Sequence, residues 1–235
     1  MVAPKSSPPR HALETREILL EAAGRIFARK GFRAATVRRI TREAGVNLAA
    51  VNYHFHDKRE LYTSALKHAH QAAARTAAAD VAGTPEKRLL LFIQGFLGYL
   101  LDPHRPAWQG RLIAREIAEP TRALDRLVEE SVLPVKKRIA GIVRDLLESR
   151  ASEARVRMAC CSIMGQCLFY VHCREMISRL FPEHRHKPED IDVLAGHIFS
   201  FSQAGLAAMR RQSVAGQKKS ASVRRRNTKT KKPHE

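Results

Sequence analysis

Two short helix-forming stretches flank Gly45-Val46 near the start of the chain, in a segment that reads TVRRITREAGVNLAAVNYHFHDKREL over residues 36–61. A residue suited to cap a helix precedes each stretch, Thr36 before the first and Asn47 before the second. Glycine at 45 can take the positive φ that reverses a chain between two packed helices. The segment therefore predicts a helix-turn-helix.

Apolar residues on the facing sides of these stretches are spaced to hold the two helices together. Ile40 and Ala44 lie on the first helix, and Val51 and Phe55 lie on the second. Since Ala44 is small, the helices can approach closely, and we expect a fixed angle between them.

The outer side of the second helix carries side chains that suit a nucleic-acid groove. Ala49 lets the backbone approach base edges, Asn52 can read an adenine edge, and Leu48 can touch a thymine methyl. Polar groups at the helix ends can hold phosphates. The residues expected to contact DNA are Thr36, Arg38, Arg39, Asn47, Leu48, Ala49, Ala50, Asn52, Tyr53, His54 and Lys58.

The rest of the chain repeats the three-to-four spacing of helix faces and has no alternating apolar run long enough for a strand. We expect an all-α protein of about nine helices. The predicted helices cover residues 15–31, 36–44, 48–54, 58–79, 85–101, 106–118, 121–149, 153–180 and 189–211. The predicted organisation is a disordered arm (1–13), a helix-turn-helix domain (14–62), a second helical domain (63–211) and a disordered basic tail (212–235).

Charge narrows the class of partner. The chain has 42 Lys and Arg against 23 Asp and Glu, and the resulting net charge of +19 favours a polyanionic partner.

The most apolar run, residues 89–101, is shorter than the about 20 residues that a membrane span needs. The N-terminal residues lack the apolar stretch of a signal peptide. We expect a cytoplasmic, nucleoid-associated protein without a membrane partner.

Residues 14–62 resemble the DNA-binding domain of the TetR family of transcriptional regulators. The residues that carry the resemblance are Phe27, Gly31-Phe32, Thr36, Ile40, Ala44-Gly45-Val46, Tyr53-His54-Phe55 and Lys58 with Leu61. Two positions depart from the family pattern, because Asn47 stands where Ser is commoner and Ala49 where Gly is commoner. Both residues belong to the surface that is expected to contact DNA, so the resemblance does not predict which operator sequence the protein binds.

The resemblance implies that residues 63–211 form a regulatory and dimerisation domain, whose last two helices pack against their copies as a four-helix bundle. The stretch SIMGQCLFYVHCREMISRLF is similar to CecR-type C-terminal domains. Two helix faces are wide enough to pack on a partner helix. One consists of Ile191, Leu194, Ile198, Phe201, Gly205 and Met209, and the other of Val156, Ile163, Cys167, Tyr170 and Arg174.

The resemblance also implies a small-molecule effector, and no other cofactor is expected. The residues predicted to line its pocket are Phe92, Phe96, Tyr99, Trp108, Arg111, Gln166, Phe169 and Tyr170. Ordinary core packing is the alternative interpretation for each of them.

Other polar residues do not indicate a catalytic or metal site. The four cysteines, Cys160, Cys161, Cys167 and Cys173, contain no C-x-x-C pair, and we interpret them as buried apolar residues, with a thiol redox sensor or a soft-metal site as the alternative. His68 and His70, and the pairs Glu116 with Glu119 and Glu129 with Glu130, are expected in solvent. No phosphate loop or nucleophile motif is present, so an enzyme is not expected.

The sequence thus predicts a sequence-specific DNA-binding regulator, a ligand-responsive repressor that acts as a homodimer on a pseudo-palindromic operator. A constitutive, charge-driven nucleic-acid-binding protein without effector control is the alternative.

Overall fold

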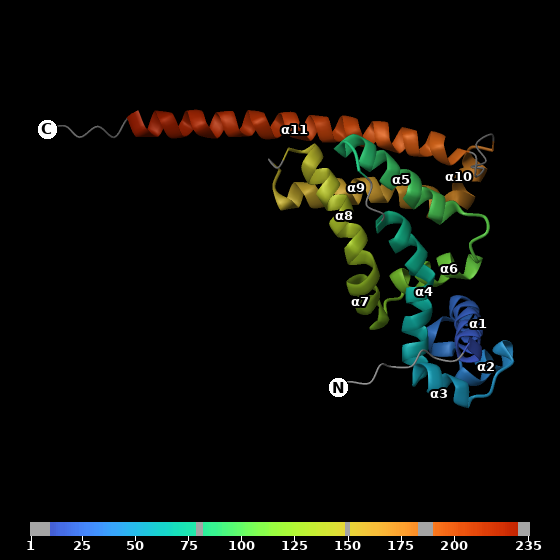
Figure 1. Cartoon of the computed structure of the whole chain (residues 1–235). Helices are drawn as coiled ribbons and strands as arrows, with labels where there is room; N and C mark the ends of the chain where they lie inside the picture. The colour runs from blue at the N-terminus through green and yellow to red at the C-terminus, as the bar shows by residue number, and fades with distance from the viewer. Residues whose placement is uncertain (1–9, 79–81, 149–150, 183–189, 230–235) are drawn as a thin grey trace. The chain divides into compact units, whose positions relative to one another are not determined.

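The computed structural model describes residues 10–78, 82–148, 151–182 and 190–229. These residues are helical and contain no β-strand, so the all-α prediction is confirmed (Figure 1). The chain forms two compact units. The first comprises residues 1–76 and 103–134, and the second comprises residues 77–102 and 135–235. None of the described helices is long and apolar enough to cross a membrane.

The first unit contains the predicted helix-turn-helix. Its elements are α1 (Arg10–Ala34), α2 (Val37–Ala44), α3 (Ala49–Phe55), most of α4 (Lys58–Ala78), α6 (Ala107–Ala118), α7 (Ala123–Leu127) and a π-helix (Val128–Val132). Helix α1 leaves the helical path at Gly31, which has φ 73°, where the sequence predicts a stop. Helix α4 is capped by Asp57, whose Oδ1 accepts hydrogen bonds from the backbone N–H groups of Arg59 and Glu60 at 2.7 and 2.8 Å.

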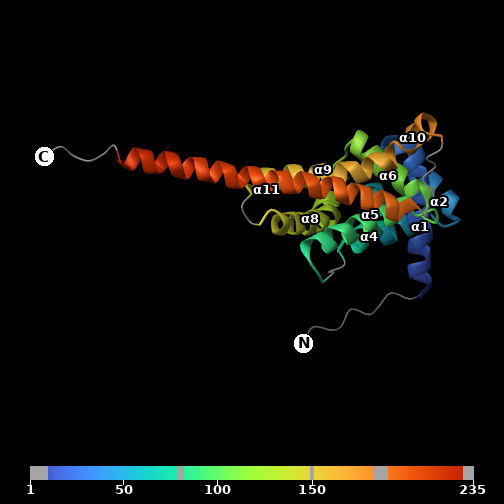
Figure 2. The ribbon, with the colours of Figure 1, turned by 90° about the horizontal axis from the view of Figure 1, so that it is seen from above.

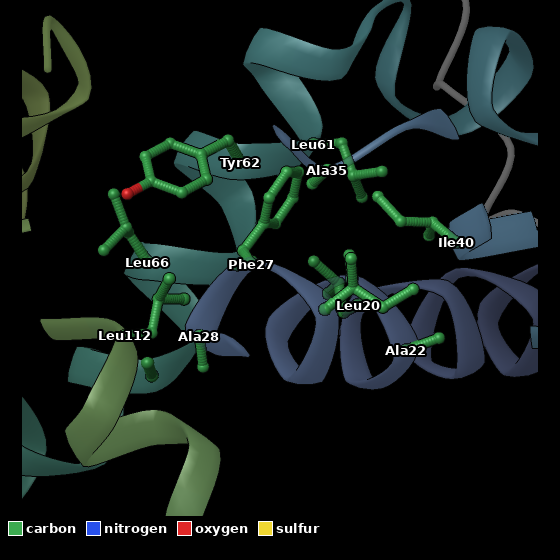
Figure 3. Packing of buried hydrophobic residues seen from close by; sticks show 14 of the residues in the cluster. Leu20, Ala22, Phe27, Ala28, Ala35, Ile40, Leu61, Tyr62, Leu66 and Leu112 are labelled. Atoms are coloured by element: carbon green, nitrogen blue, oxygen red, sulfur yellow. The ribbon is translucent and has the colours of Figure 1, made fainter. Parts of the chain in front are cut away.

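Helices α1 and α4 share the apolar core of the first unit, which Figure 3 shows from close by. Phe27 of α1 meets Tyr62 of α4 edge to face, with ring centroids 4.8 Å apart. Ile40 of α2 and Val51 of α3 are both 0% exposed within the same core. The two short helices are thereby held against α1 and α4 at a fixed angle.

Helices α1 and α6 pack in parallel with a constant offset. A Cβ built on Gly24 would lie 2.3 Å from the Trp108 ring, and one built on Gly31 would lie 3.0 Å from the Arg115 guanidinium. Gly24 and Gly31 are seven residues apart, as are Trp108 and Arg115, so equal steps along both helices stay in contact. Glycine at 24 is what allows α6 to lie this close.

The second unit is a helical bundle. Its elements are α5 (Pro85–Leu101), most of α8 (Leu133–Leu146), α9 (Glu153–His172), α10 (Arg174–Leu180) and α11 (Ile191–Lys229). Thr84 and Ser152 cap α5 and α9 by accepting from the backbone N–H groups of Lys87 and Arg155. Helix α11 packs on α5 and α9, and its C-terminal part extends past α9 (Figures 1 and 2).

Four predicted helix boundaries are wrong. Helix α1 begins at Arg10, directly after Pro8-Pro9, and not at Thr15. The predicted helix over 121–149 contains the π-helix before Pro134, which has no N–H to give to a carbonyl four residues back. The predicted helix over 153–180 breaks at Cys173.

The fourth correction concerns the predicted disordered tail, because α11 continues to Lys229. The packed start of α11 already nucleates the helix, and residues 212–229, although mixed in helix propensity, hold no proline that would end it. Residues 1–9 and 230–235 lie outside the described residues. The predicted domain boundary at residue 62 stays a prediction, although residues 103–134 pack with the N-terminal unit.

Candidate nucleic-acid interface

The turn between α2 and α3 has the backbone that the sequence predicts. Gly45 adopts φ 66° and ψ 29°, and its N–H caps α2 by donating to the carbonyls of Thr41 and Arg42. At the start of α2, the Thr36 hydroxyl oxygen accepts from the backbone N–H of Arg39 at 3.3 Å. The hydroxyl proton of Thr36 can still be donated to a phosphate. Gly45 and Thr36 therefore fix where α2 begins and ends.

Helix α3 begins at Ala49, one residue later than predicted, with Leu48 in the cap position. Asn47 nevertheless caps this turn, because its Oδ1 accepts from the backbone N–H of Ala49 at 3.0 Å. At the other end, His56 has a positive φ of 64° and its N–H donates to the Asn52 carbonyl. Both ends of this seven-residue helix are thus held by local hydrogen bonds.

Alternate sides of α3 differ sharply in exposure. Val51 is 0% and Phe55 3% exposed, whereas Tyr53 is 73% and Leu48 45% exposed. Ala49 and Asn52 are exposed as well, while Ala50 and His54 are half-buried. The helix therefore presents a small-residue and amide face outside the core, as its sequence predicts.

Basic side chains are present on the elements before and after α3. Arg38 and Arg39 of α2 are exposed. The Nζ of Lys58 donates to the Arg33 carbonyl at 3.3 Å and lies 4.7 Å from the Phe32 ring centre. Desolvation by burial lowers the pKa of Lys58. Lys58 therefore already links α4 to the end of α1.

His54 is held as a neutral imidazole at neutral pH. Burial, followed by the positive charge of Arg16, lowers its pKa below the usual value of 6.5. Arg16 lies over the ring of Phe55, 5.2 Å from its centre. A neutral imidazole at His54 still has one N–H that can donate to a phosphate.

The sequence interpretation missed an ion-pair cluster that supports α2. Glu43 of α2 pairs with Arg25 at 3.1 Å and with Arg29 at 2.7 Å, both on α1. These pairs neutralise an acidic side chain close to the exposed arginines of α2. No local pattern reveals them, because the partners are 18 and 14 residues apart.

Two further expectations for the first unit are wrong. Glu116 is 0% exposed, not solvated, and its carboxylate accepts hydrogen bonds from Tyr62 and Thr121. His70 is half-buried, and its Nδ1 has no hydrogen-bond partner among the described residues. Burial, and then the charge of Arg105, lowers the pKa of His70. Distant segments cover both residues, which helical spacing alone does not reveal.

The residues predicted to line an effector pocket are divided between the two units. Trp108 belongs to the core of the first unit, where its Nε1 donates to Glu21 at 2.9 Å. Arg111 is exposed on the same helix, α6. In the second unit, Phe92 and Phe96 are buried and stacked, with ring centres 6.1 Å apart. Tyr99 is half-buried on α5. The pocket as a whole stays a prediction.

The remaining predicted pocket residues lie on α9. Gln166 donates from Nε2 to the hydroxyl of Ser202 on α11 at 3.3 Å. Phe169 is 49% exposed and packs edge to face with half-buried Tyr170. Gln166 borders a groove of about 590 Å³ between α9 and α11.

The two faces predicted to meet a partner helix are partly wrong. Leu194 and Ile198 of α11, and Val156, Ile163 and Cys167 of α9, are buried within the protomer. Phe201 of the predicted α11 face stays exposed (66%). On α9, the exposed large apolar side chains include Met158 (56% exposed) and Phe169, which lie outside the predicted face. Met158 and Phe201 line the groove.

Two of the cysteines have the buried environment that the sequence predicts. Cys160 and Cys167 are buried, and burial raises the pKa of their thiols to about 11 and about 12. Cys161 is exposed, and Cys173 is half-buried. In the described part of the chain, no three His, Cys, Asp or Glu side chains are placed to hold a metal ion.

Comparison with known protein families gives two matches. Residues 85–206, about half of the chain, match the family described as the C-terminal domain of the HTH-type transcriptional dual regulator CecR. Residues 19–65 match the family described as bacterial regulatory proteins, tetR family.

Two relatives are named as the HTH-type transcriptional repressor AcnR. The protein of Corynebacterium efficiens is 35% identical over 96 residues, which are 41% of this chain and 46% of the relative. That of Corynebacterium glutamicum is 33% identical over 108 residues, 46% of this chain and 51% of the relative. The chain thus spans about half the length of the curated relatives it matches.

Solved structures share the fold. A putative transcriptional regulator from Pseudomonas aeruginosa PAO1 superimposes with a TM-score of 0.61 at 22% identity, covering 85% of this chain and 94% of that one. The transcriptional regulator FadR from Bacillus subtilis, solved in complex with stearoyl-CoA, has a TM-score of 0.60 at 20% identity, covering 80% and 98%.

Proposed function

Because the chain belongs to the TetR family of bacterial regulators and has a CecR-type C-terminal domain, we propose that it is a sequence-specific transcriptional repressor that acts as a homodimer. Its family consists of regulators and not of enzymes. Its place of action would be the bacterial nucleoid, in the cytoplasm.

The exposed face of α3 carries the DNA-binding proposal. Tyr53 is 73% exposed, although the same short helix buries Val51 and Phe55 in the core. A large aromatic ring left in solvent on a rigid helix is suited to a partner surface. Asn52, also exposed, has the amide geometry that pairs with an adenine edge in the major groove. We expect α3 to enter the major groove.

The phosphate contacts would come from the helix ends around α3. Arg38 and Arg39 are exposed cations on α2, and the Thr36 hydroxyl lies at its N-terminus. Such contacts position a protein on DNA without reading its sequence. Glu43 would not repel the backbone strongly, because Arg25 and Arg29 neutralise it.

A homodimer would form through the exposed apolar side of α9 and α11. Phe201, Met158 and Phe169 are large apolar side chains that solvent reaches in the isolated protomer. Ser162 and Gly205, which line the groove between them, are small enough to admit a partner's side chains. Two copies of α3 must then be about 34–36 Å apart to enter successive major grooves.

An effector would act from the second unit. The stacked rings of Phe92 and Phe96 supply an apolar wall on α5. The FadR relative in the solved structures holds an acyl-CoA, which supports a small-molecule ligand without identifying it. In one conformer of the dimer, the spacing of the two α3 helices would not fit successive major grooves. To release the operator, the effector must bind this conformer more favourably than the DNA-binding conformer by a few kcal/mol.

Selection of bound sites from random DNA tests the function. The expected result is a pseudo-palindrome whose half-site centres are one helical turn or slightly more apart, because two symmetric subunits read it. Recovery of unrelated sequences would contradict sequence-specific repression.

Removal of residues 212–235 tests the charge-driven alternative. This segment carries eight Lys or Arg and one Glu. A specific repressor should lose affinity for all duplexes alike and show a flatter salt dependence, because phosphate contacts release counterions. Loss of all DNA binding in the truncated protein, together with an unaffected Tyr53→Ala variant, would favour the alternative.

A further inference from the structure

The first unit contains a cavity that the proposed DNA contacts do not explain. It has a volume of about 700 Å³ and is bounded by the last turn of α1, by Tyr62 of α4, by the end of α6 and by residues 119–122. All of these segments belong to the first unit. The volume falls within the range of small-molecule pockets.

The charge of the cavity is strongly positive. Its lining includes Lys30, Arg33, Arg115 and Arg122, against the single carboxylate of Glu119. Glu119 pairs with Arg115 at 3.4 Å, and the Glu119 side chain is 74% exposed. Ion pairs this exposed are weak and are readily exchanged for a better partner.

Three of these cations have no acidic partner. Across the described residues, no carboxylate lies within 4 Å of Lys30, Arg33 or Arg122. Basic side chains near the C-terminal end of a helix often donate hydrogen bonds to its free carbonyl groups. Here the Arg33 carbonyl already accepts a hydrogen bond from Lys58 of α4 at 3.3 Å. The excess of positive charge therefore remains available to a ligand.

Two aromatic side chains, Phe32 and Tyr62, also line the cavity. The rings of Phe32 and Tyr62 have centroids 5.1 Å apart, with 57° between their planes. Phe32 is held in place by Lys58, and Tyr62 by its hydrogen bond to Glu116. The cavity thus combines a fixed apolar wall with flexible cations.

We propose that this cavity is a binding site for a small organic phosphate. Guanidinium groups bind phosphate through two parallel hydrogen bonds, and Arg33 and Arg122, which come from two separate segments of the lining, can supply them. The non-phosphate part of the ligand would lie against Phe32 and Tyr62. A ligand is favoured over a DNA strand because the site is a hollow, whereas the predicted DNA contacts lie on α2, α3 and the start of α4.

Such a ligand would join two parts of the first unit. It would bridge the last turn of α1, which leads into α2, and the 119–122 turn, whose Thr121 is held by Glu116. Resting on the proposed function, we expect the ligand to alter operator affinity as well as to bind.

Isothermal titration of the full chain with phenyl phosphate, in the absence of DNA, tests the site. Benzyl alcohol serves as the uncharged control ligand. The test variant is Arg33→Ala/Arg122→Ala, and the matched control is Lys136→Ala/Lys137→Ala, which removes two exposed cations from α8. The wild type is expected to bind phenyl phosphate. Its dissociation constant should rise at least about tenfold in the test variant and stay within about twofold of the wild-type value in the control variant.

Equal weakening in both double variants would overturn the proposal, because binding would then reflect net charge alone. It would also be overturned if the wild type bound no phenyl phosphate while Arg33→Ala/Arg122→Ala lost affinity for every duplex, which would make these residues DNA-backbone contacts. Since the titration contains no DNA, a failure to select an operator leaves the site standing and counts only against the repressor function.

Discussion

The phenol hydroxyl of Tyr62 on α4 donates a hydrogen bond of 2.6 Å to Oε2 of Glu116 on α6. The other carboxylate oxygen, Oε1, accepts from the backbone N–H and the hydroxyl of Thr121, each at 2.8 Å. Glu116 is 0% exposed, so these hydrogen bonds replace the water that the carboxylate loses. The buried side chain of Glu116 therefore ties α4, the helix that follows the helix-turn-helix, to α6 and to the turn after α6.

Tyr62→Phe should lower the free energy of unfolding by about 1–3 kcal/mol, because it removes a donor from a buried carboxylate. Denaturant unfolding followed by circular dichroism measures this. The matched control is Tyr53→Phe, which removes a hydroxyl from a side chain 73% exposed and should change stability by less than about 0.5 kcal/mol. Equal effects in the two variants would contradict the role given to Glu116.

Gly24→Ala should destabilise the protein by about 1–3 kcal/mol, because the new methyl group would overlap the Trp108 ring. Trp108 is the only tryptophan, so its fluorescence reports the displacement directly. In contrast, a Cβ at Gly110 on α6 would meet no atom of the described residues within 4 Å, so Gly110→Ala should stabilise the helix by about 0.5–1 kcal/mol. A Gly24→Ala protein with unchanged stability and emission would refute the close α1–α6 packing.

His70 should make stability fall in mild acid. Burial and the charge of Arg105 lower the pKa of His70 in the folded protein. As the pH falls through about 6.5, the usual pKa of histidine, the unfolded chain therefore binds more protons than the folded protein does. Stability contributed by neutral His70 is therefore present above that pH and is lost as the pH falls, by at most about 1.4 kcal/mol per pH unit.

The variant His70→Gln should flatten the dependence of unfolding free energy on pH between 7.5 and 5.5, about the range in which histidine titrates. His197→Gln, on an exposed position of α11, controls for the loss of an imidazole. If both variants kept the wild-type slope, His70 would not be the group responsible.

Phe201→Asp should convert the proposed homodimer to a monomer. The new carboxylate would be desolvated at the proposed interface, and we expect dimer dissociation to increase by roughly a hundredfold, about 3 kcal/mol. Light scattering after size-exclusion chromatography measures the mass. Val128→Asp, at a 37% exposed position of the first unit, should stay dimeric. A dimeric Phe201→Asp protein would place the interface elsewhere.

Local sequence patterns predicted the helix-turn-helix (α2, α3 and the turn between them) well, because the residues that determine it are close together in sequence. The cap at Thr36, the positive φ of Gly45 and the alternation of Val51 and Tyr53 each depend on neighbours within a few residues. The ion pairs of Glu43 were beyond such reasoning, because they join separate helices.

Longer-range packing explains the other differences. Trp108 was predicted to line an effector pocket, with core packing as the alternative; Gly24 opens a place for its ring in the core beside α1, 84 residues away in sequence. Composition predicted a disordered tail after residue 211, whereas the packed start of α11 nucleates a helix that continues to Lys229. The predicted partner faces on α9 and α11 were partly wrong, because α5 packs on both helices.

The central claim is that the outer face of α3 reads base pairs. It is tested most directly by fluorescence anisotropy, which gives the ratio of dissociation constants for a scrambled duplex and for the selected operator. The wild type should prefer its operator by at least about a thousandfold. Asn52→Ala should reduce that preference by about 1–3 kcal/mol and leave binding to the scrambled duplex unchanged, while Met176→Ala on α10 should alter neither. A wild type that binds both duplexes equally, or an Asn52→Ala variant that keeps the full preference, would contradict the account.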